Sequence, residues 1–131
     1  MELYCLSGAT PSNQFRPIPE LILQKVPCPP TLETLWLHLN EINSIDPKAF
    51  DQCTGLLLLG VGGNTFSFLA KDTFAGLPNI ETIAVNVCPS LETIQTGAFP
   101  MESENLKEIM LNGNTKLTCV ESEFLTGKYI R

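Results

Sequence analysis

Apolar and polar positions alternate in a pattern that returns four times between residues 32 and 124. In the first copy Leu35 and Leu37 flank one outward position, Trp36, and the same arrangement recurs at Leu59 and Val61, a shift of 24 residues. An alternation with a period of two is typical of a strand with one buried face. Because one short strand cannot bury that face alone, the pattern predicts stacked strands that share a core.

The four copies align slot by slot, and the third and fourth have one extra residue after the fourth slot. The aligned slots are Leu32, Leu35, Leu37, Asn40, Ile42, Ile45, Phe50; Leu56, Leu59, Val61, Asn64, Phe66, Leu69, Phe74; Ile80, Ile83, Val85, Cys88, Leu91, Ile94, Phe99; and Leu106, Ile109, Leu111, Asn114, Leu117, Val120, Phe124. We therefore expect one domain, with a cap at 1–31 and repeats at 32–55, 56–79, 80–105 and 106–131.

The spacing L-x-x-L-x-L-x-x-[N/C]-x-L at a period in the twenties resembles the leucine-rich repeat. The resemblance covers residues 32–124. It implies an α/β-type solenoid of about four repeats plus an N-terminal cap. Its strands would form a short, curved parallel sheet on the concave face, and the convex side would be mostly irregular or 3-10 in conformation.

Two sets of slots are expected to be structural. The amide slot turns the chain out of the strand, where an inward Asn can satisfy backbone groups that no sheet ladder reaches. Cys88 takes this slot in the third copy, and we interpret it as buried and structural, not as a reactive thiol. The amide-slot residues are Asn40, Asn64, Cys88 and Asn114, and the core spine consists of Phe50, Phe74, Phe99 and Phe124.

The cap and the remaining cysteines allow further predictions. Cys5 and Cys28 both precede the first repeat in a Pro-rich segment that would need covalent support, so we predict a disulfide between them. Leu21-Ile22-Leu23 is expected to add a strand to the edge of the first repeat. Cys53 takes the slot of Leu77 and is expected to be buried and reduced. Cys119 is expected near the convex surface, either paired with another molecule or as a free thiol.

Charge, hydropathy and cysteine content argue against several classes of protein. The chain has 131 residues and a net charge of −6 with no basic cluster, which argues against a nucleic-acid partner. No apolar run is long enough to span a membrane. The N-terminus does not look like a signal peptide, so the chain is either cytosolic or a secreted protein without its leader. The cysteines favour a secreted or extracellular protein, and Leu23-Gln24-Lys25-Val26-Pro27 resembles the end of the cap in extracellular leucine-rich repeat proteins.

No catalytic set is visible in the sequence. His38 is the single histidine and has no local triad partner, and the cysteines lack the paired spacing of a zinc site. Gly60-Val61-Gly62-Gly63 lacks the Lys-Ser/Thr of a phosphate loop. We predict a protein that is not an enzyme and that has no metal site and no cofactor.

The residues free to specify a partner are those that the repeat turns outward on the strand face. They form rows across neighbouring strands, and the Trp36 row continues with small residues, which makes a partly apolar, shallow surface. An exposed Trp is a frequent interface anchor. The predicted ligand-binding residues are Thr34, Trp36, His38, Leu58, Gly60, Thr82, Ala84, Asn86, Glu108, Met110 and Asn112, with Leu39, Gly62, Gly63, Val87 and Gly113 in the remaining outward slots.

Two functions remain open from the sequence. The repeats are similar to those of Toll-like receptor ectodomains and of variable lymphocyte receptors, which implies an immune-receptor-like module that binds a protein or a microbial surface glycan on its concave face. The alternative is an adhesion or structural module that forms a homodimer through its last repeat, because no C-terminal cap signature follows Phe124. A further possibility is that the face has no binding role, because its residues are merely tolerated at the surface or because the N-terminal segment packs over Trp36.

Overall fold

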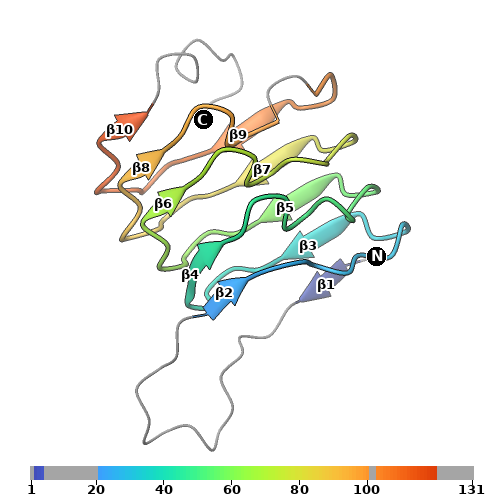
Figure 1. Cartoon of the computed structure of the whole chain (residues 1–131), viewed down its shortest axis with the longest axis horizontal. Coiled ribbons are helices and arrows are strands. Elements are labelled where there is room, and N and C mark those ends of the chain that lie inside the picture. Colours follow the sequence, from blue (N-terminus) through green and yellow to red (C-terminus); the bar gives the residue numbers. More distant parts are fainter. Residues whose placement is uncertain (1, 5–20, 101–102, 121–131) are drawn as a thin grey trace, which may run out of the picture.

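The computed structural model describes residues 2–4, 21–100 and 103–120. These residues form a solenoid, and each successive turn adds a strand to one parallel sheet (Figure 1). The sheet has the order β1-β3-β5-β7-β9. Its strands are β1 (Glu2–Tyr4), β3 (Thr34–Trp36), β5 (Leu58–Gly60), β7 (Thr82–Ala84) and β9 (Glu108–Met110). The predicted solenoid with a parallel strand face is thereby confirmed.

Equivalent slots of successive turns lie side by side in this sheet. Trp36 pairs with Gly60, Gly60 with Ala84, and Ala84 with Met110. The central residue of each strand faces inward, because side chains alternate across a strand. Leu35, Leu59, Ile83 and Ile109 are accordingly fully buried. The opposite side of the sheet is the one predicted as the concave face, and we keep that name.

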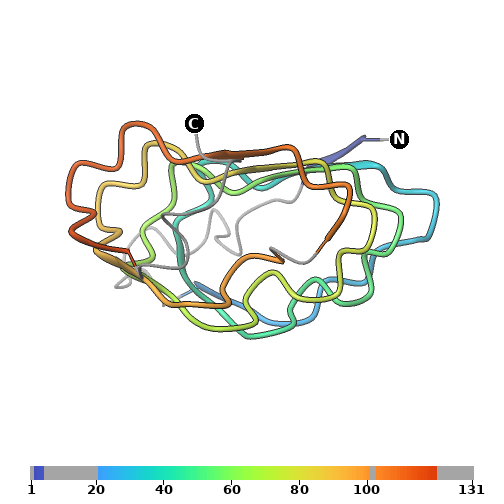
Figure 2. The same ribbon diagram turned by 90° about the horizontal axis from the view of Figure 1, so that it is seen from above.

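From each strand of this sheet the chain returns through turns to the next one (Figure 2). The return segments carry a second set of short strands (Figure 1). The described residues contain no helix. The convex side in this part of the chain therefore consists of turns and short strands, without the 3-10 conformation that was one of the two expectations. These strands form two small parallel sheets, one of two strands and one of three. They are β2 (Leu21–Leu23) with β4 (Ile42–Ile45), and β6 (Phe68–Leu69) with β8 (Thr93–Ile94) and β10 (Cys119–Val120).

The core between the two sets of strands is apolar and continuous along the stack. The rings of Phe50 and Phe74 stack with centroids 5.8 Å apart, and those of Phe74 and Phe99 with centroids 5.0 Å apart. All three rings are buried. Phe124 lies outside the described residues. Because each ring contacts the next, the spine couples neighbouring turns and not only the residues within one turn.

The amide slot joins each turn to the one before it. Asn64 is fully buried, and its amide nitrogen donates to the carbonyl oxygens of Leu37, Val61 and Gly62, while its Oδ1 accepts from two backbone N–H groups of the preceding turn. Asn114 repeats part of this arrangement with Val85 and Leu111.

Cys88 is buried, and its sulfur lies 3.8 Å from the carbonyl oxygen of Asn86 and 3.9 Å from that of Val61. Burial raises the pKa of the Cys88 thiol, which keeps it in the poorly nucleophilic protonated form.

The cap residues that are described add one more turn at the N-terminal end. Glu2–Tyr4 pairs with β3, and Leu21–Leu23 pairs with β4 in the second set of strands. The predicted Leu21–Leu23 strand is therefore present. The strand that extends the concave sheet is Glu2–Tyr4, which the sequence pattern did not indicate.

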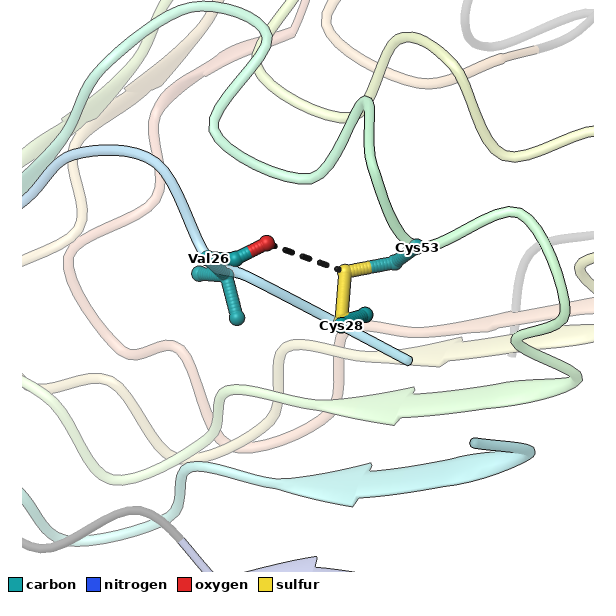
Figure 3. The surroundings of a disulfide bond; sticks show 3 residues. All are labelled: Val26, Cys28 and Cys53. Atoms are coloured by element: carbon teal, nitrogen blue, oxygen red, sulfur yellow. Dashed lines mark hydrogen bonds between the residues drawn. A yellow bond between two sulfur atoms is a disulfide. The ribbon is translucent and has the colours of Figure 1, made fainter. Parts of the chain in front are cut away.

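The predicted Cys5–Cys28 disulfide is wrong, because Cys28 is bonded to Cys53 (Figure 3). The cap runs alongside the return segment of the first repeat, where Val26 N–H donates to the Ala49 carbonyl at 2.9 Å. This register brings the Cα atoms of Cys28 and Cys53 to 4.8 Å, within the range of a disulfide. Cys53 is buried, as expected, but it is not reduced. Cys5 lies outside the described residues.

Candidate functional site

The concave face is less open than the alternation of the sequence suggests. Thr34, Trp36, Leu58, Thr82 and Met110 are half-buried, and Asn112 is exposed. Among the slots predicted to face outward, however, three are buried in the structure. These are Gly60, Gly62 and Ala84.

The first turn covers the glycines of the second. The rings of Trp36 and His38 lie 5.1 Å apart between centroids and are tilted by 41° to each other. A Cβ atom at Gly60 would overlap His38 Cε1 and lie 2.6 Å from Trp36 Cε3. The absence of a side chain at Gly60 therefore lets both rings lie down on the sheet. Together they form an aromatic surface across the first two turns, which we call the Trp36–His38 platform.

An unpaired acceptor lies beside this platform. The Oδ1 atom of Asn86 is buried, and no group among the described residues donates to it. A Cβ at Gly62 would lie 2.6 Å from this oxygen and 3.1 Å from His38 Cδ2, so the amide and the imidazole meet above Gly62. A buried acceptor without a donor is costly, and such atoms need an explanation such as water or a ligand.

The face over the first three turns carries no charged side chain. The fourth turn places the acidic Glu108 in an outward slot, and at the N-terminal edge of the sheet Glu2 of β1 is in register with the outward Thr34. The charges nearest in sequence precede the strands, where Lys107 Nζ pairs with Glu81 Oε1 at 2.7 Å. The chain has 14 acidic and 8 basic residues, so their absence from the outward slots of three turns means that charge is unevenly distributed over the surface. A neutral, partly aromatic face suits the binding of a partner.

The comparison with protein families agrees with the geometry. Residues 30–89 match the family model described as Leucine rich repeat. The match covers less than half of the chain, and together with the stacked parallel strands it supports a leucine-rich repeat solenoid as the fold. No curated protein matches it. Leucine-rich repeat domains generally mediate recognition of other proteins and are typically binding modules without catalytic activity.

One feature of the leucine-rich repeat turns was missed by sequence reasoning. The third residue after each of the strands β3, β5, β7 and β9 has a left-handed backbone, with φ of 57° at Leu39, 68° at Gly63, 56° at Val87 and 77° at Gly113. Glycine at two equivalent slots was the available signal, because glycine adopts this conformation at no steric cost. A second missed feature is the register of Tyr4 with Trp36, which extends the row by one residue.

Outside the concave face, the described residues offer little that could serve as a functional site. A hollow of about 480 Å³ lies between the segments that precede β7 and β9. Pro78, Pro100 and Asn105 are among the residues that line it. Hydrogen bonds from Ser103 and Asn105 to the Pro78 carbonyl close the loops around it. Within the described residues, no group of three or more His, Cys, Asp or Glu side chains is arranged to hold a metal ion. The side chain of Cys119 lies outside what the structure describes.

His38 should titrate below the ordinary histidine range. Partial burial lowers the pKa of His38 from its ordinary value of 6.5, because burial disfavours the charged imidazolium. A base with a depressed folded pKa contributes stability that is present above pH 6.5 and is lost as the pH falls through the folded value. We expect the His38 ring signals to show this lowered pKa by NMR titration, which is unambiguous because the chain has one histidine.

The same titration has a consequence for stability. The wild type should lose more stability between pH 7 and pH 5 than His38→Gln, which keeps a polar side chain but does not titrate in this range. Urea unfolding at the two pH values measures the difference. Equal losses in the two proteins would show that His38 is not desolvated on the platform.

Proposed function

We propose that this leucine-rich repeat chain is a recognition module that binds another protein through the concave face of its first three turns. The observation that supports this most is the Trp36–His38 platform, an aromatic surface over turns whose outward slots hold no charged residue. Trp side chains are enriched among residues that dominate binding energy. The buried Oδ1 of Asn86, to which no described group donates, lies beside the platform.

The setting we propose is extracellular. The Cys28–Cys53 disulfide fits an oxidising compartment. No helix in the described part of the chain is long and apolar enough to cross a membrane. An immune-receptor-like role, with a foreign surface molecule as ligand, is the biological context suggested by the resemblance to Toll-like and variable lymphocyte receptors.

Self-association through the last repeat is the alternative. It depends on the side chain of Cys119 and on residues 121–131, which lie outside the described residues. The concave face is supported by described contacts, and for that reason it carries the proposal.

The double variant Trp36→Ala/Leu58→Ser tests the concave face. The wild type would be screened against an array of extracellular proteins and an array of bacterial surface glycans. Every protein that it binds should be bound at least about tenfold more weakly by the double variant, because a buried aromatic anchor is lost. A matched control is Phe68→Ser, which removes an exposed apolar side chain from the second set of strands.

The outcomes separate the readings. Loss of binding with the double variant but not with Phe68→Ser supports the concave face. Binding that survives in the double variant contradicts it. Ligands found only on the glycan array would replace the protein partner by a microbial glycan.

A further inference from the structure

The third residues after the concave strands β3, β5, β7 and β9 form a line of equivalent positions, which we call the rim: Leu39, Gly63, Val87 and Gly113. All four share the left-handed backbone conformation. Neighbouring strands lie about 4.8 Å apart, so the rim extends over roughly 14 Å along the stack. Large apolar residues alternate with glycines along it.

Leucine and valine are poor choices for this backbone conformation. Glycine adopts it freely, as Gly63 and Gly113 do at the same slot. Valine is branched at Cβ and rarely adopts positive φ. Residues held in such conformations cluster at functional sites, because something other than local stability retains them. The turn itself therefore does not explain Leu39 and Val87.

Core packing does not explain them either. Leu39 is 80% exposed and Val87 is 56% exposed, and they are two of the four large apolar residues that are exposed in the described chain. Each lies over the glycine of the next turn. A Cβ at Gly63 would come within 2.6 Å of Leu39 Cδ2, and a Cβ at Gly113 within 2.9 Å of Val87 Cγ2. Two side chains thus cover the rim of four turns with apolar surface that remains open to solvent.

The rim continues the uncharged concave face. Leu39 follows His38 of the platform, and Val87 follows Asn86, whose Oδ1 lacks a donor. No charged residue occupies the outward slots of these three turns, although the chain has a net charge of −6. An acidic partner would be repelled by the net charge, and a basic partner would find no counter-charge at these slots. The complementary surface is therefore uncharged and apolar.

We propose that Leu39 and Val87 are the apolar anchors for an uncharged, apolar segment of the partner protein, which contacts the rim and the Trp36–His38 platform together. This inference rests on the proposed function and specifies the chemistry of the partner. Binding would be governed by apolar burial and would depend little on salt, because no charge pair contributes.

The test uses a phage-displayed library of random peptides selected on the folded full chain. Enriched peptides would be synthesised and measured by calorimetry against the wild type, Leu39→Gly, Val87→Gly, their double variant, Trp36→Ala/Leu58→Ser, and Phe68→Ser as control. We expect uncharged peptides with aliphatic or aromatic side chains. Their affinity should fall at least about tenfold in the double glycine variant and change less than about twofold between low and physiological salt.

Stability provides the second readout. Glycine at a left-handed position relieves strain, so the urea midpoints of Leu39→Gly and Val87→Gly should equal or exceed that of the wild type. A purely structural role would lower the midpoints. Weaker binding in a protein that is no less stable assigns Leu39 and Val87 to recognition.

Several results would overturn the inference. These are charged or salt-sensitive peptides, failure to enrich any peptide, and glycine variants of lower stability. Peptides that tolerate the double glycine variant but are lost in Trp36→Ala/Leu58→Ser would leave the proposed function standing and refute the rim. Peptides that tolerate both variants and require Phe68 would refute both.

Discussion

Replacing Asn64 with alanine should lower the free energy of unfolding by about 4 kcal/mol, because several buried backbone groups lose their partner together. Asn64 is fully buried and donates to three carbonyl oxygens, at 2.9 Å to Leu37, 2.8 Å to Val61 and 3.3 Å to Gly62. Its Oδ1 accepts from the N–H groups of Asn40 at 2.9 Å and Ile42 at 3.1 Å. Urea unfolding followed by circular dichroism measures the change.

The expected size follows from where these groups lie. Each buried donor or acceptor left without a partner costs about 1–3 kcal/mol, although the costs overlap when one cavity admits water to several of them. The amide also joins two turns, since it contacts Leu37 in one and Val61 in the next. Its loss therefore weakens the coupling on which a repeat protein depends.

Asn40→Ala is the matched control. Asn40 occupies the same slot one turn earlier, is only half-buried, and its side chain donates one hydrogen bond, to the His38 carbonyl at 3.1 Å. Its replacement should cost about 1 kcal/mol. Similar losses at the two positions would contradict the view that the number of buried hydrogen bonds sets the cost.

The repeat slots could be predicted from sequence because each is enforced by a local period and by stacking. Leu35 and Leu59 alternate with outward neighbours, and the in-register parallel sheet requires both to face the core. The order of strands followed from the same reasoning, since each turn contacts its neighbours in the chain. Apart from Leu21–Leu23, the second set of short strands was not expected, because two-residue strands such as β6 show no period.

The disulfide could not be predicted in this way. Which cysteine meets Cys28 depends on the register between the cap and the first repeat, and that register is set by non-local contacts such as the Val26–Ala49 hydrogen bond. Sequence proximity within the cap favoured Cys5, whereas stacking favours Cys53.

The candidate site, too, could be predicted only in part from the sequence. Alternation placed Trp36 and Gly60 on one face, but it carried no information on the direction in which the Trp36 and His38 rings lean. The ring positions depend on the missing side chains of Gly60 and Gly62 in the next turn. The left-handed rim was within reach of sequence reasoning, because Gly63 and Gly113 share a slot.

Removing the Cys28–Cys53 disulfide should lower the free energy of unfolding by about 3 kcal/mol, since the bridge closes a loop across a sequence separation of 25 residues. The bond joins the cap to the first repeat, so its loss should also let the cap detach before the rest of the solenoid unfolds. The double variant Cys28→Ala/Cys53→Ala avoids placing a hydroxyl in the buried Cys53 site. Urea unfolding gives the stability, and hydrogen exchange of Leu21–Leu23 relative to Leu58–Gly60 reports detachment of the cap.

Cys5→Ser distinguishes this bridge from the pairing that the sequence suggested. With Cys28 bonded to Cys53, the Cys5→Ser protein should keep the bridge and unfold at the wild-type midpoint, and peptide mapping without reductant should recover Cys28 linked to Cys53. A loss of stability in Cys5→Ser as large as that in the double variant, with Cys53 free to react with a thiol reagent in the native protein, would instead establish Cys5 as the partner of Cys28. The cap would then be closed on itself, and its attachment to the first repeat would rest on non-covalent contacts such as the exposed Lys25–Asp51 ion pair, which contribute little.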